Sequence, residues 1–452
     1  MVVHQPLLLE EALSRCTTNL MLIADANASR YVRRMEVFVR KEAGFLVLIT
    51  LMHALFVERG LVLANAHTLH VDSIARIEEE IAGLDARLFT VREHIGMITK
   101  GLVVGMPGMA RLVLSVAYDP VIDRAFVGPL AHSYAGSLTS LDLRSSVVAG
   151  SAVVFDRLQS LKMVLDASGR SPVVVKSEGL RELELSRIPS TFGWHKLIGM
   201  DSCQRLRFSQ LTTLTLHFMP YTTADGHAET GSNLMSVELP LLKRLEVSNA
   251  SSNHALLAEC AFPRHLQTVN NRYSTEALGR LQNVETIDYM RVMISNGELS
   301  TQVHAVLNRW FGGTGVCLDG GMQVFSTQHI DASVVDWQRL TFLYLAECVS
   351  FGDLARLMPR IPQVRDLALR KPEFSASDVK VLEDAGPLSV ALQRLALYGA
   401  GERAACIEWL VERLPRLRSL RSTVYSADEF ARFCNARQTA YPHLAGILFE
   451  AV

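Results

Sequence analysis

Apolar residues recur along the chain in a six-residue pattern with apolar first, fourth and sixth positions and mostly polar positions between them. Because strand side chains point alternately to opposite faces, each copy predicts a short strand with one apolar face. The clear copies are LTSLDL (138–143), LQSLKM (158–163), LRELEL (180–185), LTTLTL (211–216), LKRLEV (242–247), LTFLYL (340–345), VRDLAL (364–369) and LQRLAL (392–397).

Weaker copies extend the pattern over most of the chain. They lie at 32–37, 66–71, 109–114, 266–269, 284–289, 417–420 and 444–449. In the copy at 284–289, Val284, Ile287 and Tyr289 take the apolar positions. The long steps from 66 to 109 and from 284 to 340 each have room for a further copy, and Val-Cys-Leu at 316–318 is a candidate for the second step. Such a period predicts stacked, similar units.

Proline marks the start of four copies. Pro240, Pro362, Pro415 and Pro442 each lie two residues before the first apolar position. Proline has no N–H group and disfavours a helical conformation in the residue before it. We therefore expect each of these prolines to end a helix and to begin an extended segment.

Helical signals lie between the strand copies. The stretch ERAACIEWLVERLPR (402–416) places Cys406, Leu410 and Leu414, with Trp409, on one side of a helix. The segments 350–353 and 426–429 each carry an acidic residue three positions after a serine, a variant of the capping-box pattern at helix starts.

The sequence therefore predicts an α/β solenoid, a curved horseshoe of irregular repeats with parallel strands on its concave face and helices on its convex face. Residues 1–30 are predicted to form an N-terminal helical cap and residues 31–452 the solenoid. Loop insertions are expected near the polar stretch 221–233 and near 311–322, where glycines cluster. A chain of 452 residues exceeds the roughly 250–300 residues that one core supports, which favours a fold that grows by addition.

With these motifs the chain resembles leucine-rich-repeat proteins of the ribonuclease-inhibitor-like kind, and it is similar to the divergent F-box/leucine-rich-repeat proteins of fungi. The resemblance covers about residues 30–452 and rests on the strand motifs and the prolines. It implies that partner proteins bind on the concave face. An F-box, the helical module by which such proteins join a ubiquitin ligase, is not recognisable before the first copy.

The position after each strand departs from this family. The family places Asn or Cys there, and one copy follows it at Cys348. The corresponding positions of other copies hold Ser146, Asp166, Ile188, Met219 and Ala400. We therefore expect the curvature of the solenoid to be irregular.

Composition limits the classes of partner and compartment. The net charge of −1 gives no global reason to expect nucleic acid or a membrane as partner. Seven cysteines are dispersed without a C-x-x-C pair, which indicates reduced thiols in an intracellular protein. The longest uncharged run, 43–57, is shorter than the ~20 residues of a membrane-spanning helix, and the N-terminus lacks the features of a secretory signal. The expected location is cytoplasmic or nuclear.

Chemical motifs are scarce. The chain contains no G-x-x-x-x-G-K-[ST], G-x-S-x-G or H-E-x-x-H sequence. The cluster FGGTGVCLDGG (311–321) is interpreted as a turn or loop, since neither a Lys-Ser/Thr pair nor dinucleotide-binding spacing accompanies it. His67 and His70 are predicted to point to opposite faces of a strand and not to form a metal site. We expect no enzymatic activity, no cofactor and no metal.

Function is expected on the concave face, where the side chains between the apolar positions project. The predicted surface residues are Asp142, Arg144, Glu182, Glu184, Thr213, Thr215, His217, Arg244, Glu246, Glu285, Asp288, Phe342, Tyr344, Asp366, Arg370, Arg394, Tyr398 and Arg421.

Part of this surface suggests a protein-binding site. Exposed aromatic and arginine side chains are enriched among the residues that dominate binding energy at interfaces. The candidate residues are Phe342, Tyr344, Arg370, Arg394, Tyr398 and Arg421, with the three arginines forming a basic strip. Alternatively, Phe342 packs against a neighbouring loop and the arginines pair with acids such as Asp366.

Three functions stay open at this point. The first is a scaffold or adaptor that binds a partner protein of unknown identity on the concave face. The second, implied by the resemblance, is substrate recognition within an SCF-type ubiquitin ligase, with the adaptor that F-boxes bind as a partner. The third is a leucine-rich-repeat regulator of a GTPase that supplies an arginine to its partner.

Overall fold

The computed structural model describes residues 31–39, 52–73, 96–116, 128–146, 153–165, 173–176, 178–189, 192–198, 205–219, 236–248, 255–272, 281, 284–294, 315–320, 339–345, 358, 361–370, 391–399 and 404–451. The chain divides into two compact units. Unit 1 comprises Met1–Leu242 and Asn253–Ala261, and unit 2 comprises Lys243–Ser252 and Phe262–Val452.

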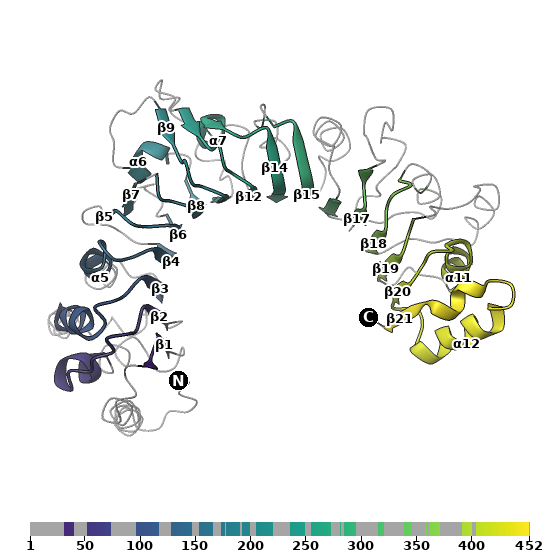
Figure 1. The fold of residues 1–452 in the computed structure, drawn as a ribbon, viewed down its shortest axis with the longest axis horizontal. Helices are drawn as coiled ribbons and strands as arrows, with labels where there is room; N and C mark the ends of the chain where they lie inside the picture. Colours follow the sequence, from purple (N-terminus) through teal and green to yellow (C-terminus); the bar gives the residue numbers. More distant parts are fainter. Residues whose placement is uncertain are drawn as a thin grey trace. The chain divides into compact units, whose positions relative to one another are not determined.

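Unit 1 contains a parallel sheet whose neighbouring strands follow one another along the chain (Figure 1). Its strands are β1 (Arg34–Val39), β2 (Thr68–Ser73), β3 (Arg111–Val116), β4 (Ser140–Ser146), β6 (Ser160–Val164), β8 (Glu182–Ile188) and β10 (Thr213–Phe218). Two smaller parallel sheets lie beside it, β5 (Val153–Phe155) with β7 (Val173–Val175), and β9 (Arg205–Arg207), β11 (Ser236–Glu238) and β13 (Cys260–Ala261). The described helices of unit 1 include η2 (Ala54–Glu58), α5 (Gly128–Ser133), α6 (Trp194–Ile198) and α7 (Ala255–Ala258), and residues 96–105 are also helical.

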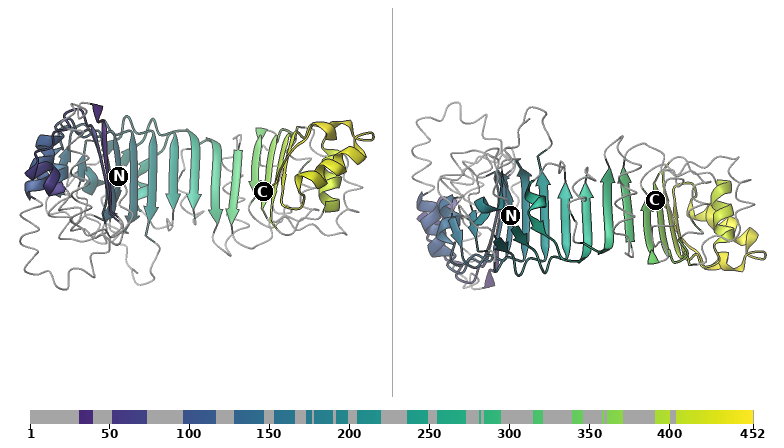
Figure 2. Two further views of the ribbon diagram at one scale, coloured as in Figure 1. Left: turned by 90° about the horizontal axis from the view of Figure 1, so that it is seen from below. Right: turned by 90° about the horizontal axis from the view of Figure 1, so that it is seen from above.

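Unit 2 is built in the same way, and Figure 2 shows its strands side by side. In order they are β12 (Arg244–Ser248), β14 (His265–Arg272), β15 (Thr286–Ile294), β16 (Gly315–Gly320), β17 (Phe342–Leu345), β18 (Asp366–Arg370), β19 (Arg394–Tyr398), β20 (Ser419–Ser422) and β21 (Leu448–Ala451). The helices α11 (Ala404–Arg413), α12 (Ala427–Arg437) and η10 (Pro442–Gly446) lie between its last strands. The prediction of a parallel-stranded, leucine-rich-repeat-like fold is confirmed.

The repeated leucines hold each sheet to its core. In unit 2, the register aligns the fourth motif position of successive strands, for example Leu343, Leu367, Leu395 and Leu420. All four are at most 2% exposed. Burying such a side chain contributes about 1.5–3 kcal/mol, and a shift by one residue would turn the apolar set toward solvent. The apolar pattern therefore fixes the register as well as the strands.

The four prolines lie in tight turns. In each case the residue two positions after the proline donates its N–H to the carbonyl of the residue that precedes the proline, at an N–O distance of 3.0–3.3 Å. The donors are Leu242, Val364, Leu417 and Leu444. Proline is favoured at the second position of such turns because its φ is already set. Each strand then begins a few residues later, so the expectation that proline itself begins the extended segment is wrong.

A fifth turn of this kind precedes β3 and was missed by the sequence pattern. Met109 donates its N–H to the carbonyl of Met106 at 3.3 Å, with Pro107 between them.

The copy at 284–289 is shifted by three residues from its predicted frame. In β15 the buried residues are Ile287 and Met290, and Met290 aligns with Val269 on one side and Val316 on the other. The motif is therefore Ile287, Met290 and Val292, which fits the six-residue pattern better. As a consequence, Tyr289 lies on the open face and not in the core.

Of the two long intervals between copies of the motif, one contains a further strand of the sheet and the other does not. Residues 315–320 form β16, which confirms the strand at 316–318 and makes the predicted loop over 311–322 wrong for this segment. By contrast, β2 pairs directly with β3, so the sheet has no further strand between them. The predicted cap at 1–30 and the insertion at 221–233 lie outside the described residues.

The last helices match their sequence signals. Ser426 and Glu429 form a reciprocal capping box at the start of α12. In α11, Cys406, Trp409 and Leu410 are buried as the spacing predicts. Among the described residues, no helix is long and apolar enough to cross a membrane.

Candidate functional site

The open face of each sheet is the face that carries the side chains between the buried motif positions. Two rows of unit 2 define its open face. The first open row is Arg244, Thr268, Tyr289, Gly315, Phe342, Asp366, Arg394, Ser419 and Leu448. The second open row is Glu246, Asn270, Arg291, Tyr344, Ala368, Ala396, Arg421 and Glu450, with Cys317 in register between Arg291 and Tyr344.

Two aromatic side chains of the first open row contact each other across an intervening strand. The rings of Tyr289 on β15 and Phe342 on β17 have centroids 6.2 Å apart and an interplanar angle of 40°. The strand between them, β16, places Gly315 in register with both. Because neighbouring strands are about 4.8 Å apart, residues two strands apart meet only where the middle position leaves room.

Gly315 provides that room. A Cβ at this position would lie 2.7 Å from Cδ2 of Tyr289 and 3.8 Å from Cβ of Phe342. The first distance is shorter than van der Waals contact, so any larger residue would displace the tyrosine ring. Gly315 is itself buried beneath the two rings. Glycine is needed at this position because its lack of a side chain lets the rings of Tyr289 and Phe342 approach each other.

Tyr344 extends these aromatics into the second open row. It lies two residues after Phe342 on β17 and therefore on the same face. Phe342, Tyr344 and Tyr289 are all half-buried, so each keeps part of its ring surface exposed to solvent. We call Tyr289, Phe342 and Tyr344 the aromatic patch.

Next to the aromatic patch, the second open row carries small side chains. Ala368 and Ala396 follow Tyr344 across the next two strands, and Arg421 comes after them. The face therefore presents only methyl groups between the tyrosine and the arginine in this row. Both alanines are half-buried.

The candidate arginines do not form a basic strip, because the register puts them in different rows. Arg394 lies opposite Asp366 in the first open row, Arg421 lies opposite Ala396 in the second, and Arg370 lies opposite Tyr398 beyond both. The predicted alignment of the three is wrong.

Two of these arginines are paired with acids. Arg394 donates to both carboxylate oxygens of Asp366, which raises the pKa of Arg394 through the hydrogen bond and the charge. Arg421 is hydrogen-bonded to Tyr398 and Glu450, and both partners raise its pKa. The alternative that Arg394 pairs with Asp366 is therefore confirmed. The patch is bordered by ion pairs and not by a line of free cations.

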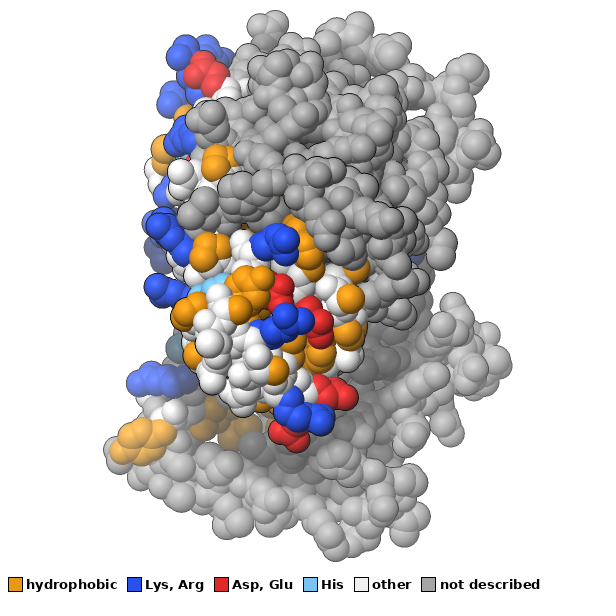
Figure 3. Space-filling view, turned by 90° about the vertical axis from the view of Figure 1, so that its right-hand side faces the viewer, with side chains coloured by type: hydrophobic (Ala, Val, Ile, Leu, Met, Phe, Trp, Pro, Cys, Tyr) orange, Lys and Arg blue, Asp and Glu red, His pale blue; other side chains and the backbone are white. Residues whose placement is uncertain are grey.

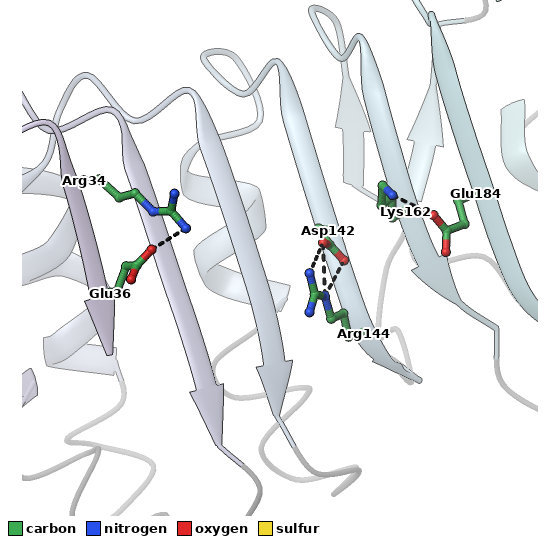
Figure 4. Close-up of polar contacts among 6 residues, drawn as sticks. All are labelled: Arg34, Glu36, Asp142, Arg144, Lys162 and Glu184. Atoms are coloured by element: carbon green, nitrogen blue, oxygen red, sulfur yellow. Dashed lines mark hydrogen bonds and ion pairs between the residues drawn. The ribbon is translucent and has the colours of Figure 1, made fainter. Parts of the chain in front are cut away.

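The open face of unit 1 has a different character (Figure 4). Its ion pairs join Arg34 with Glu36, Arg144 with Asp142, and Lys162 with Glu184. The hydrogen bond to Glu184 raises the pKa of Lys162, and that to Asp142 raises the pKa of Arg144. Salt bridges at exposed positions contribute about 0–1 kcal/mol each.

The described residues hold no group of three or more His, Cys, Asp or Glu side chains that could bind a metal ion. His70 lies within β2, and His67 lies just before it, with its Nδ1 3.1 Å from Oγ1 of Thr68. Sequence reasoning missed Tyr289 and Gly315. The signal for Tyr289 was present in the frame Ile287–Met290–Val292, whereas Gly315 matters only through the side chains beside it.

Comparisons with known proteins add little. No family model matches the chain, and no curated protein matches it. One solved structure that is similar to it is a leucine-rich-repeat protein of Leptospira interrogans, with 12% identity, a TM-score of 0.30, and coverage of 85% of this chain and 88% of that chain. A similarity of this size carries no argument, so the assignment of a leucine-rich-repeat-like fold rests on the parallel strands and their register.

Proposed function

We propose that this chain is a protein-interaction scaffold of the leucine-rich-repeat solenoid type, and that a partner protein binds on the open face of unit 2. The proposal treats the aromatic patch as the centre of that interface. It assigns no catalytic step to the chain and identifies no partner.

The observation that carries the proposal is the grouping of Tyr289, Phe342 and Tyr344 on one face. Aromatic side chains are enriched at interface hot spots, where they cluster near the centre of the contact. Tyrosine offers a large apolar surface together with a hydroxyl group that hydrogen-bonds at the rim. Holding the Phe342 ring against the Tyr289 ring also reduces the entropy that the side chains would lose on binding.

The surroundings of the patch fit an interface. The small side chains of Ala368 and Ala396 let a partner approach the backbone next to Tyr344. The Arg394–Asp366 pair borders the patch in the first open row, in the way that polar residues surround the apolar centre of many interfaces. Arg421 lies beyond the alanines and is half-exposed, with 51% of its side chain accessible.

The test compares partner capture by three versions of the full chain. Phe342→Ala/Tyr344→Ala removes two rings of the patch. Thr213→Ala/Thr215→Ala is the matched control, because these residues hold the same motif positions on β10 in unit 1. Partners are quantified by mass spectrometry, and one is then purified and titrated against each version. Loss of affinity by about tenfold or more in the aromatic variant alone supports the proposal. Equal affinity of all three versions contradicts it.

The ubiquitin-ligase and GTPase-regulator functions have no particular support among the described residues. The segment in which an F-box remnant was sought, 1–30, lies outside them. Binding of the purified chain to the F-box adaptor, and stimulation of GTP hydrolysis in a panel of GTPases, are the measurements that would favour either one. The proposal expects neither effect.

A further inference from the structure

A second charged surface lies where the strands of unit 2 begin. Each of the four consecutive strands β17 to β20 carries at least one exposed arginine at or just before its start. These residues, which we call the basic edge, are Arg339, Arg365, Arg394, Arg416 and Arg418. Figure 3 shows Lys and Arg side chains following one another along one margin of the molecule.

The charged side chains in this part of unit 2 are almost all positive. The described segments 339–345, 361–370, 391–399 and 415–422 contain seven arginines and one acidic residue, Asp366. That one acid already binds Arg394. Arg339, Arg365, Arg416 and Arg418 make no ion pair with any described acidic residue. The net charge of the whole chain is only −1, so this excess is local.

The backbone fixes the spacing of these arginines. The N–H of Arg365 donates to the carbonyl of Thr341 at 2.8 Å, and the N–H of Arg418 donates to that of Gln393 at 2.8 Å. The two arginines thus hold equivalent positions in repeats separated by one strand, β19. Two strand spacings place their Cα atoms roughly 10 Å apart. Arg416 is held in the turn from Leu414 to Leu417, which contains Pro415.

We propose that the basic edge binds an extended acidic segment of a partner protein. A segment in the polyproline II conformation is extended by about 3.1 Å per residue and has three residues per turn, so a carboxylate at every third residue recurs on one side of the chain at roughly 9 Å, close to the spacing of Arg365 and Arg418. Arginine binds carboxylates in a bidentate geometry, as Arg394 does with Asp366.

A protein segment suits this edge better than a single-stranded nucleic acid. Proteins that bind single strands combine positive charge with aromatic side chains on which bases stack. Among the described residues, those that flank the arginines along the edge are Pro362, Gln363, Gln393 and Pro415, none of which is aromatic. The aromatic patch lies on the open face, where Phe342 is packed against Tyr289.

The test measures binding of a fluorescent peptide of repeated Glu-Gly-Ser to the full chain by fluorescence anisotropy at low salt. A peptide with Gln in place of Glu is the ligand control. Arg365→Glu/Arg418→Glu reverses two charges of the edge. Arg157→Glu/Arg181→Glu makes the same charge change at exposed positions shortly before β6 and β8 in unit 1. Circular dichroism establishes that each variant is folded, and Arg365→Gln/Arg418→Gln replaces the first variant if it is not.

We expect the Glu peptide to bind and the Gln peptide not to bind. Affinity should fall by about tenfold in the unit 2 variant and by less than about twofold in the unit 1 variant, and it should weaken as salt screens the charges. No binding of the Glu peptide, or an equal loss in both variants, overturns the proposal. Tighter binding of a single-stranded oligonucleotide that depends on Arg365 and Arg418 also overturns it.

This inference is independent of the aromatic patch. The variant Phe342→Ala/Tyr344→Ala should lose the partner of the open face but keep the acidic peptide. If it loses the peptide as well while staying folded, the peptide lies on the open face and the basic edge is not its site.

Discussion

Tyr289 and Phe342 lie two strands apart, yet their rings are in contact, because Gly315 on the strand between them carries no side chain. This relationship organises the aromatic patch. It depends on three strands keeping one register, in which the buried Met290 and Leu343 align with Val316 of the strand between them.

Replacing Gly315 by alanine should disturb this contact. The added Cβ would lie 2.7 Å from Cδ2 of Tyr289, so the ring must move away from Phe342. We expect the free energy of unfolding to fall by about 0.5–1.5 kcal/mol, the range of an aromatic pair. Denaturant unfolding measures it. Gly446→Ala is the control, since a Cβ there meets nothing within 4 Å. Equal effects in the two variants would contradict a special role for Gly315.

Removing the acid that neutralises Arg394 should strengthen the basic edge. Asp366→Asn deletes the charge that Arg394 binds, while Arg394 stays exposed over 70% of its side chain. We expect the acidic peptide to bind a few-fold more tightly. The free energy of unfolding should change by less than about 1 kcal/mol, because the lost salt bridge is at the surface. Fluorescence anisotropy measures the peptide affinity, and urea titration measures the free energy of unfolding. Weaker peptide binding by Asp366→Asn would contradict the idea that Asp366 only neutralises Arg394.

The capping box of α12 should make stability depend on pH. Hydrogen bonds from the backbone N–H and hydroxyl of Ser426 lower the pKa of Glu429 below its ordinary value of 4.5. A carboxylate whose pKa is lower in the folded state stabilises that state above the ordinary value, and this contribution is lost as the pH falls through the lowered value. Wild type should therefore exceed Glu429→Gln in stability at neutral pH, and the difference should vanish in acid. Urea unfolding at several pH values checks this; a constant difference would contradict it.

The proline turns should act mainly through the unfolded chain. Pro362→Ala keeps the hydrogen bond from Val364 to Ile361, at 3.1 Å, but gives the unfolded chain more freedom. We expect a loss of about 0.4–1 kcal/mol in the free energy of unfolding. Gln363→Ala, at the next position of the same turn, should change it by less than about 0.5 kcal/mol. A loss in the control as large as in the proline variant would mean that the turn is stabilised by something else.

Much of the fold could be predicted from the sequence because the apolar pattern carries it. The leucines at Leu343, Leu367 and Leu395 fix both the strands and the face that each buries. The pattern is weakest in β15, where two overlapping frames compete, and Tyr289 was placed in the core for that reason. Only the pairing with β14 and β16 decides between the frames.

The site could be predicted only in part. Phe342 and Tyr344 follow from the alternation along β17, so the sequence places them on the open face. Whether Arg394 and Arg421 align depends on the register between strands, and a sequence pattern within one strand does not contain it. The same is true of Gly315, whose role comes from residues about 26 positions away on each side.

The most direct test of the proposed interface is a photo-crosslinking experiment. The photoreactive amino acid p-benzoylphenylalanine replaces Tyr344 in one version of the full chain and Thr215, the corresponding residue of β10, in the other. After irradiation with the purified partner, crosslinked species are identified by mass spectrometry. The account predicts a discrete crosslink from position 344 and none from position 215. A crosslink from position 215 alone, or none from position 344 to a partner that binds the chain, would contradict it.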